Sequence, residues 1–396
     1  MRVALFTNAY KPITNGVVTY IAGIKNALLK EGHKAYVFAP EFHNYEDDED
    51  CIYRYKSVDL TTKVDFPVAI PYSIEAYEIL KDFAPDIIHV HHPFVLGRVA
   101  YRYAKRLNVP IIFTFHTDYG IYSNFIPFPD AWVKTTCNLL IKDFANKVTC
   151  ITVPSQAKAD LLRSYGVQNR IEIIHNSVNI EAFDNVNARD ICKIKEKYGL
   201  TGFKVLLYVG RIAHEKNIKF LLDSFERIYA RDQSYKLLVV GDGPQLEELK
   251  ECAGETNAGK HIIFTGSIEN SELPAVYKSA DIFVFASPNE GFPMVIMEAM
   301  AAKLPIVSVN APWTTEVMTN GFNALMAPED PERFCDTVIN LLGDSQLYEQ
   351  LQKNGIETAN NYSLESVSKR LFSLYDELIK NNVKPKKRAL EKIFTE

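Results

Sequence analysis

Residues 280–309 read ADIFVFASPNEGFPMVIMEAMAAKLPIVSV, a stretch that combines a strand, a tight loop and a helix. The β-branched and aromatic run Ile282–Phe285 is typical of a buried strand, and Met294–Ala302 has a helical composition. A helix that begins directly after such a loop points unpaired backbone N–H groups, and the positive end of its dipole, at the strand tip. We therefore expect an anion to bind at this point of the fold.

Two carboxylates flank the expected anion site. Glu290 lies in the loop and Glu298 lies four residues beyond Met294, so both side chains can face one crevice. A carboxylate does not bind phosphate, but it accepts hydrogen bonds from hydroxyl groups. An anion site beside two such acceptors indicates a sugar nucleotide. The simpler interpretation is an ordinary strand, loop and helix with acidic residues at the surface.

The stretch belongs to the second of two series of alternating strands and helices. Such alternation predicts βαβ units and parallel sheets. The polar segment 175–190 between the two series suits a hinge between domains. In the first series we expect strands at Arg2–Thr7, Ala35–Ala39, Ile87–Val90, Ile111–Thr114 and Thr149–Val153, with helices at Val17–Lys30, Ser73–Asp82 and Gly97–Leu107. In the second series we expect strands at Val205–Val209, Lys236–Val240, Ile262–Thr265, Ile282–Phe285 and Ile306–Val309, with late helices at Ser345–Ala359 and Leu364–Lys380.

Composition limits the class of protein. The 396 residues are 47% hydrophobic and 23% charged, which is enough for two cores. The formal net charge of −5 argues against a nucleic-acid partner. Six cysteines without a CxxC pair are interpreted as buried thiols in a reducing compartment. Since neither a signal peptide nor an apolar run of about 18 residues is seen, we expect a cytoplasmic protein that can still lie on a membrane surface.

Two loops at strand ends contain further candidate binding residues. Arg211 and Lys216 follow the strand Val205–Val209, at the sheet edge where open α/β sheets bind ligands. Two cations there would stabilise the charge that develops on a leaving nucleoside diphosphate; alternatively, one of them forms a helix-capping salt bridge with Glu215. Gly16, after the first strand, either lets the backbone approach a phosphate or acceptor closely, or simply begins a helix.

These motifs together resemble those of the retaining glycosyltransferases of family four. Glu290 and Glu298 have the family's Glu-x7-Glu spacing, and residues 210–217 match its Gly-Arg…Glu-Lys-Asn motif. The resemblance covers nearly the whole chain and implies the α/β architecture called GT-B, with two Rossmann-like domains whose parallel sheets face each other across a cleft. The expected domains are an N-terminal acceptor domain, 1–178, and a C-terminal nucleotide-sugar donor domain, 179–364, with the last helix, at about 365–396, returning to the first domain.

The resemblance also implies roles for single residues. Glu290 and His116, the latter in the segment FTFHTD, would contact the donor sugar, Glu298 the ribose, and Arg211 and Lys216 the diphosphate. Backbone at Gly266 and Ser267 would read the base. The other donor-site residues are Gly16, Gly291, Phe292, Pro293, Met294 and Val295.

No metal and no other cofactor is expected. Asp48-Glu49-Asp50 has the Asp-x-Asp pattern of metal-dependent transferases, but it lies in a run of five acidic residues with no strand before it, so we interpret it as a solvated surface loop. Arg211, Lys216 and the helix terminus already oppose the phosphate charge. His89, His91 and His92 are divided between two faces by strand alternation, which favours packing at the strand tip over a metal site.

The acceptor is expected to be a lipid. The segments NAYKPITNGVVTYI (8–21) and FHTDYGIY (115–122) resemble the bacterial 1,2-diacylglycerol 3-glucosyltransferases, which implies transfer of a hexose, glucose from UDP, to a diacylglycerol-type lipid. Trp132 and Lys134, after the aromatic segment 119–129, and the basic tail 383–394 indicate an anionic membrane surface, so we expect a peripheral protein on the inner face of the cell membrane. A hydrophobic lid, a dimer contact or a disordered tail would be simpler explanations.

Several alternatives remain open at this point. A family-four enzyme could use another acceptor, such as phosphatidylinositol, a polysaccharide, a small thiol or a sugar. A sugar-nucleotide epimerase of the same architecture and a non-catalytic sugar-nucleotide-binding subunit are further possibilities. The base, the sugar and the oligomeric state are not determined by the residues.

Overall fold

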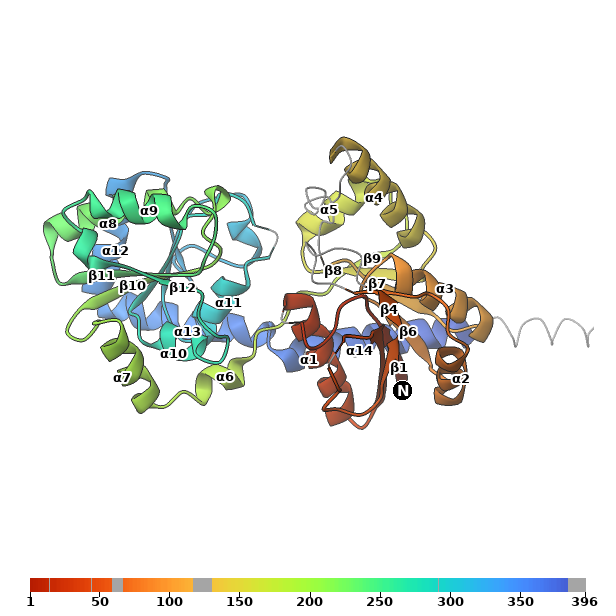
Figure 1. The fold of residues 1–396 in the computed structure, drawn as a ribbon. Helices are drawn as coiled ribbons and strands as arrows, with labels where there is room; N and C mark the ends of the chain where they lie inside the picture. The colour runs from red at the N-terminus through yellow and green to blue at the C-terminus, as the bar shows by residue number, and fades with distance from the viewer. Residues whose placement is uncertain (14, 44, 59–66, 117–129, 291, 384–396) are drawn as a thin grey trace, which may run out of the picture. The chain divides into compact units, whose positions relative to one another are not determined.

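A computed structural model describes residues 1–396 except 14, 44, 59–66, 117–129, 291 and 384–396 (Figure 1). The chain divides into two compact units. One comprises Met1–Asn176 and the residues from Val367 onward, and the other comprises Ser177–Ser366. Each unit is built on one main parallel sheet with flanking helices, which confirms the predicted fold class.

The N-terminal unit contains a seven-stranded parallel sheet in the order β3-β2-β1-β6-β7-β8-β9. Every residue of β6, β7 and β8 is buried, because helices cover both faces of the sheet. Helix α14 contributes Val367, Leu371 and Tyr375 to the same hydrophobic core as β1. The elements are β1 (Arg2–Phe6), α1 (Gly16–Lys30), β2 (Lys34–Pro40), β3 (Ile52–Tyr55), β4 (Ser57–Val58), β5 (Val68–Ala69), α2 (Ile74–Phe83), β6 (Ile87–Val90), α3 (Val95–Leu107), β7 (Ile111–Thr114), α4 (Asp130–Ala145), β8 (Cys150–Val153), α5 (Gln156–Ser164), β9 (Ile171–Ile173) and α14 (Leu364–Val383).

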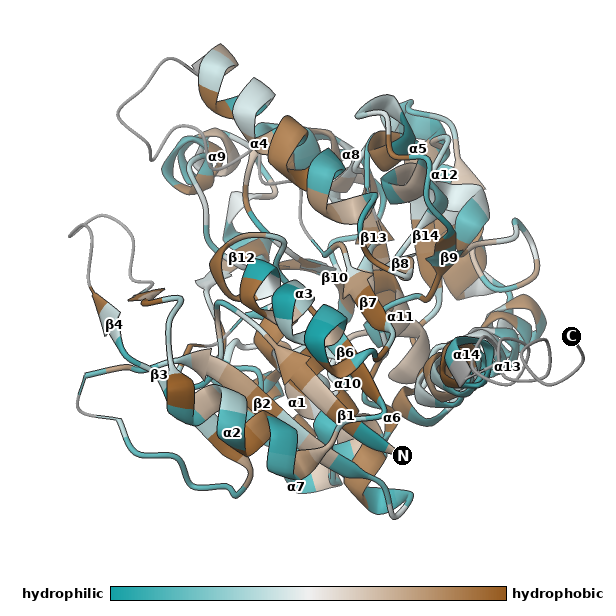
Figure 2. Cartoon of the chain, turned by 90° about the vertical axis from the view of Figure 1, so that its right-hand side faces the viewer, coloured by the Kyte–Doolittle hydropathy of each residue, from teal (hydrophilic) through white to brown (hydrophobic). Residues whose placement is uncertain are grey.

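The C-terminal unit contains a six-stranded parallel sheet in the order β12-β11-β10-β13-β14-β15. The strand order reverses between β10 and β13, and ligands of open α/β sheets bind at such a switch point. Figure 2 shows the strands mainly in the apolar colour, as expected for sheets covered on both faces. The elements are α6 (Ile180–Asp184), α7 (Ala188–Lys197), β10 (Lys204–Val209), η2 (His214–Lys216), α8 (Ile218–Arg231), β11 (Tyr235–Val240), α9 (Leu246–Gly254), η3 (Gly259–His261), β12 (Ile262–Gly266), α10 (Leu273–Lys278), β13 (Ile282–Phe285), α11 (Met294–Ala301), β14 (Ile306–Val309), η4 (Thr314–Glu316), β15 (Leu325–Ala327), α12 (Pro331–Gly343) and α13 (Ser345–Asn361).

The short edge strands β3 and β15 were not predicted. β3 has the sequence Ile-Tyr-Arg-Tyr and follows an acidic run, and β15 is the three-residue segment Leu-Met-Ala. Neither forms the continuous β-branched run by which the central strands were found. Their pairing is set by the neighbouring strands β2 and β14.

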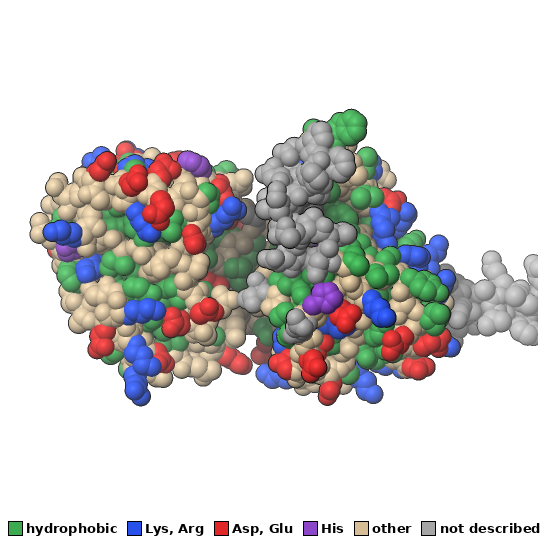
Figure 3. Space-filling view, in the orientation of Figure 1, with side chains coloured by type: hydrophobic (Ala, Val, Ile, Leu, Met, Phe, Trp, Pro, Cys, Tyr) green, Lys and Arg blue, Asp and Glu red, His purple; other side chains and the backbone are tan. Residues whose placement is uncertain are grey.

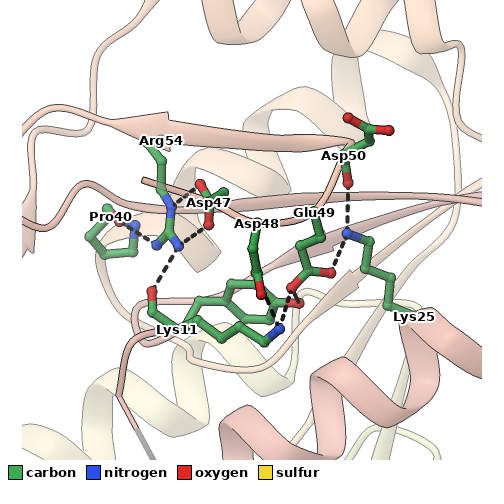
Figure 4. Close-up of polar contacts among 9 residues, drawn as sticks. Lys11, Lys25, Pro40, Asp47, Asp48, Glu49, Asp50 and Arg54 are labelled. Atoms are coloured by element: carbon green, nitrogen blue, oxygen red, sulfur yellow. Dashed lines mark hydrogen bonds and ion pairs between the residues drawn. The ribbon is translucent and has the colours of Figure 1, made fainter. Parts of the chain in front are cut away.

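The acidic run 46–50 is only in part the solvated loop that its composition predicted, because Glu46, Asp48 and Asp50 are exposed whereas Asp47 and Glu49 are half-buried. Figure 4 shows the carboxylates of Asp47, Asp48 and Glu49 in contact with basic side chains from other segments. The Glu49 carboxylate accepts from Lys25 Nζ at 2.7 Å and pairs with Lys11 Nζ at 2.9 Å. Lys25 is 2% exposed, and its ammonium also donates to the carbonyl oxygen of Asp50. A buried cation needs such partners, so Glu49 neutralises the buried Lys25 and the carbonyl oxygen of Asp50 completes its hydrogen bonding.

Arg54 on β3 forms the second half of this ionic cluster. Its guanidinium donates two hydrogen bonds to the Asp47 carboxylate, at 2.9 and 2.6 Å. It also donates to the carbonyl oxygens of Lys11 and Pro40, at 2.7 and 2.9 Å. The cluster therefore connects the loop after β1, helix α1, the loop after β2 and strand β3 (Figure 4).

The six cysteines are all free thiols, but the expectation that they are buried is only partly right. Cys150 and Cys335 are buried, whereas Cys51 and Cys192 are exposed. Cys51 precedes β3 and Cys192 lies on α7, and neither position could be recognised as a surface position from the spacing of the cysteines.

Candidate functional site

The loops that follow β10 and β13 bring two of the predicted site residues together. Lys216 Nζ lies 2.6 Å from Glu290 Oε1, and both side chains are largely buried, at 19% and 12% exposure. Lys216 ends η2 after β10, and Glu290 lies in the loop between β13 and α11. The proposed capping salt bridge with Glu215 is therefore wrong for Lys216, and Glu215 itself is exposed.

Two residues that the sequence did not suggest hold the Glu290 loop in place. The hydroxyl of Ser287 is 3.0 Å from the carbonyl oxygen of Glu215 and 3.1 Å from that of Asn289, both within donating distance. The indole N–H of Trp313 donates to the carbonyl oxygen of Ser287 at 2.9 Å. These contacts join the β13 loop to η2, and they fix the backbone on both sides of the Lys216–Glu290 pair. Nothing in the local pattern around Trp313 could have indicated this role.

Glu298 has a buried partner that the sequence did not indicate. The hydroxyl of Tyr277, on α10, donates to Glu298 Oε2 at 2.7 Å. Tyr277 is fully buried and Glu298 is half-buried. Burial raises the pKa of the Glu298 carboxyl, and the hydrogen bond from Tyr277 partly offsets this rise. The hydrogen bond from Tyr277 thereby fixes the orientation of the carboxyl.

Glycines let the strand-tip loops of this unit lie against one another. A Cβ atom on Gly241 would lie 1.9 Å from the carbonyl oxygen of Gly210, and one on Gly243 would lie 2.2 Å from that of Ile212. Gly266 ends β12 with a φ of +71°, and its carbonyl oxygen accepts from the N–H of Gly241 at 3.0 Å. Larger residues at 241 and 243 would separate the loops after β10 and β11, so these glycines define the edge of the site.

The remaining predicted donor-site residues lie at the same sheet edge. Arg211 has an exposed side chain, and its carbonyl oxygen accepts from the Tyr208 hydroxyl at 3.0 Å. Pro293 precedes α11 and forms no side-chain cap, so its side chain does not satisfy the first backbone N–H groups of the helix. Gly291 lies outside the described residues. Ser267 is exposed beside Gly266, and Phe292, Met294 and Val295 are half-buried at the start of α11.

His116 and Gly16 belong to the N-terminal unit. His116 follows β7, is half-buried, and has its Nε2 atom 3.0 Å from Nδ1 of His91. Gly16 begins α1 directly after Asn15, whose side chain caps the helix by accepting from the Val18 N–H. A Cβ on Gly16 would meet open space, so no close contact with the described residues requires glycine there.

The predicted packing of histidines at the strand tip is confirmed for His89 and His91, which are fully buried. His89 contacts the Tyr375 hydroxyl through Nδ1 at 2.5 Å and the Thr114 hydroxyl through Nε2 at 2.6 Å. Burial lowers the pKa of His89 to about 3, so this ring is neutral at pH 7.

Helix α4 exposes apolar side chains. Trp132 is 75% and Leu139 59% exposed, and Lys134 is also exposed. Apolar side chains are visible at the top of the right-hand unit in Figure 3, where α4 begins. Leu140 is also exposed, while Val133, Ile141 and Phe144 are buried. The aromatic segment 119–129 and the basic tail from 384 lie outside the described residues.

Comparison with known proteins gives matches over both units. The family model described as Glycosyltransferase Family 4 matches residues 14–182, and the one described as Glycosyl transferases group 1 matches residues 190–358. An alpha-monoglucosyldiacylglycerol synthase of Streptococcus pneumoniae is 31% identical over 391 residues, which are 96% of this chain and 87% of the relative. A GDP-mannose-dependent alpha-mannosyltransferase of Corynebacterium glutamicum is 28% identical over 338 residues, which are 82% of this chain and 76% of the relative.

Among solved structures, the Anabaena protein Alr3699/HepE in complex with UDP-glucose is similar over almost its whole length. The TM-score is 0.71 at 15% sequence identity, over 95% of this chain and 99% of that chain. At this identity the likeness concerns the fold. It covers both units, each with its own parallel sheet.

Proposed function

The chain belongs to the family-four glycosyltransferases of GT-B fold, and from this we propose that it moves a hexose, glucose, from UDP to a diacylglycerol-type lipid with retention of the anomeric configuration. The observation that carries the proposal is the Lys216–Glu290 pair at the switch point of one sheet, next to helix α11, which contains Glu298. The glucose and the lipid acceptor are supported by the name of the pneumococcal relative.

Each side chain of this set has a task in the proposed reaction. Lys216 and Arg211 would hold the diphosphate and stabilise its growing charge as the glycosidic bond breaks. Glu290, once its ammonium partner turns to the diphosphate, would accept hydrogen bonds from the sugar, and Glu298 would accept them from the ribose. His116 would contact the sugar. No side chain is assigned as general base, so the acceptor proton would pass to the departing phosphate.

The identity of the donor is tested by a hydrolysis screen. The mannosyltransferase relative makes GDP-mannose a second candidate donor. We expect UDP-glucose to be hydrolysed faster than UDP-galactose, UDP-N-acetylglucosamine and GDP-mannose when no acceptor is present. Preferential hydrolysis of GDP-mannose would move the proposal to a mannosyl donor. Release of an epimerised sugar nucleotide would instead favour an epimerase.

Tyr277→Phe should weaken nucleotide binding through Glu298. The substitution removes only the hydroxyl that holds Glu298 Oε2 at 2.7 Å. A hydrogen bond to a charged group contributes about 1.5–3 kcal/mol, so a weakening of UDP binding by about tenfold to a hundredfold is expected. Calorimetric titration with UDP measures the loss. The same titration with UDP lacking both ribose hydroxyls should show almost no difference between wild type and variant.

Tyr348→Phe is the matched control for that experiment. The Tyr348 hydroxyl also donates over 2.7 Å in the same unit, but to the carbonyl oxygen of Asp281 at the start of β13. The Tyr348→Phe substitution should leave UDP affinity unchanged. Equal losses in the two variants, or an equal loss for the nucleotide without ribose hydroxyls, would show that Tyr277 acts on the fold and not on ribose binding.

We also propose that the protein lies peripherally on the cytoplasmic face of an anionic membrane. Among the described residues, no helix is long and apolar enough to cross a bilayer. Support for surface binding comes from exposed Trp132 and Leu139 on α4 and from the tail 383–394, which contains five basic residues and one acidic residue. A basic residue near anionic lipid contributes about 1 kcal/mol, and salt screens this attraction.

Binding to vesicles is the corresponding prediction. We expect the protein to float with vesicles that contain phosphatidylglycerol, to be released by salt, and to bind neutral vesicles weakly. Deletion of residues 384–396 should reduce flotation and leave donor hydrolysis unchanged, and Trp132→Ala should reduce flotation further. If flotation does not depend on anionic lipid, and a water-soluble sugar or thiol serves as acceptor as well as lipid, the lipid assignment fails.

A further inference from the structure

Two histidines from neighbouring strands are in direct contact in the N-terminal unit. His91 follows β6 and His116 follows β7, and these strands pair in parallel. Nδ1 of His91 lies 3.0 Å from Nε2 of His116. The two rings are stacked with their centroids 5.3 Å apart and their planes at 25°. One of the two nitrogens must carry the proton of this hydrogen bond.

The surroundings of His91 decide which nitrogen is the donor. Its other nitrogen, Nε2, is buried and has no hydrogen-bond partner within the described part of the chain. The ring centroids of Tyr20 and His89 lie 5.9 and 4.1 Å from the centroid of the His91 ring, and the nitrogens of His89 contact Tyr375 and Thr114. If His116 were the donor, His91 would have to carry its proton on this unpaired Nε2. A buried N–H without a partner costs about 1–3 kcal/mol and is rarer than a buried acceptor without one.

Both rings are neutral at pH 7, so each carries a single ring proton. Burial lowers the pKa of His91 and of His116 well below the usual value, and the neighbouring histidines lower both pKa values further. With one proton each, a hydrogen bond from His91 Nδ1 leaves the proton of His116 on its own Nδ1.

We propose that His91 is a positioning residue, which donates from Nδ1 to His116 Nε2 and holds His116 in the tautomer protonated on Nδ1. His116 then offers a fixed N–H donor, which suits a hydroxyl oxygen of a sugar. The Tyr20 ring, edge-on to His116 with the ring centroids 4.9 Å apart, limits rotation of the imidazole. The consequence for catalysis rests on the proposed function, because it takes His116 to contact the donor sugar. The tautomer itself does not depend on that function.

The tautomer can be read directly by nitrogen NMR of protein labelled with ¹⁵N-histidine. The signals of His116 are assigned by their loss in His116→Ala. We expect His116 to be protonated on Nδ1 in the wild type. In His91→Asp, which offers only acceptor oxygens, the proton should move to Nε2. A wild-type His116 protonated on Nε2 would overturn the proposal.

Kinetics of three variants test the consequence for catalysis. His91→Leu removes the donor and should lower kcat by about tenfold to a hundredfold, the range found when partners of metal-bound histidines are removed. His91→Asn places an amide near the position of Nδ1 and should recover most of the rate. His89→Asn, at an equally buried ring that does not hydrogen-bond to His116, is the control for loss of packing, and thermal unfolding of each variant checks the fold. Equal losses in the Leu and Asn variants would contradict positioning by a hydrogen bond.

The two proposals can fail separately. If wild-type protein transfers no sugar to any acceptor, the proposed function fails, and the NMR result still decides the tautomer. If transfer occurs but His116 is protonated on Nε2, only the inference about His91 fails.

Discussion

Lys216→Ala is expected to lower the rate of glycosyl transfer by about a hundredfold to a thousandfold, the loss that follows removal of one preorganised charge-stabilising group. Lys216 is 19% exposed, so its ammonium acts in a setting poor in water, where a fixed charge is most effective. In the proposed role, the contact of Lys216 with the diphosphate would strengthen as the sugar departs, so the loss should appear in kcat more than in KM. Initial rates at saturating donor measure it.

Lys219→Ala is the matched control. Lys219 lies three residues further on, is 54% exposed and pairs with Asp223 on its own helix. The Lys219→Ala substitution should leave kcat unchanged. Thermal unfolding must accompany the Lys216 variant, because Glu290 loses its partner. If cations replace a metal in this site, transfer by the wild type should also persist in EDTA, and a strict requirement for manganese or magnesium would contradict the roles given to Lys216 and Arg211.

Lys25→Met should lower the free energy of unfolding by about 3–5 kcal/mol, the usual cost of removing one partner from a buried ion pair. The methionine keeps the apolar part of the side chain but leaves Glu49 with Lys11 as its remaining ammonium partner in the ionic cluster. Urea unfolding followed by circular dichroism measures the change. The double variant Lys25→Met/Glu49→Gln should recover much of the loss, because removing both partners of a buried pair is often close to neutral. A Lys25→Met protein as stable as wild type would show that the cluster contributes nothing to the fold.

The same cluster predicts how stability depends on pH. Burial by itself would raise the pKa of the Glu49 carboxyl, but the hydrogen bonds from Lys25 and Lys11 outweigh it, and the pKa falls below its usual value of 4.5. A carboxyl whose pKa is lowered in the folded state stabilises the fold above its unfolded pKa, and this contribution is lost as the pH falls. The stability difference between wild type and Glu49→Gln should therefore be full above pH 4.5 and shrink below it.

The sequence predicted well those features that depend on neighbours along the chain. The central strands are continuous apolar runs, and Glu290 and Glu298 lie in one strand-loop-helix unit, so their common location followed from spacing alone. The pairing of Lys216 with Glu290 did not follow from the spacing, because it depends on how closely the loops after β10 and β13 approach each other in space.

Other features depended on tertiary contacts for which the sequence has no local signal. In the sequence, Tyr277 cannot be distinguished from an ordinary aromatic core residue, because its hydrogen bond to Glu298 forms only when α10 packs against α11. The whole run 46–50 looked solvated because acidic residues rarely enter a core, and the buried Lys25 that pairs with Glu49 lies on a helix with an otherwise ordinary apolar face.

The central claim is that this chain moves glucose from UDP to a diacylglycerol with retention, and the anomeric configuration of the product tests it most directly. Purified protein is incubated with UDP-α-glucose and diacylglycerol in mixed micelles, and the lipid product is examined by proton NMR at the anomeric position. We predict an α-linked glucosyl diacylglycerol, absent from reactions with Glu290→Gln. A β-linked product, or release of free glucose or an epimerised sugar nucleotide with no glycolipid formed, would contradict it.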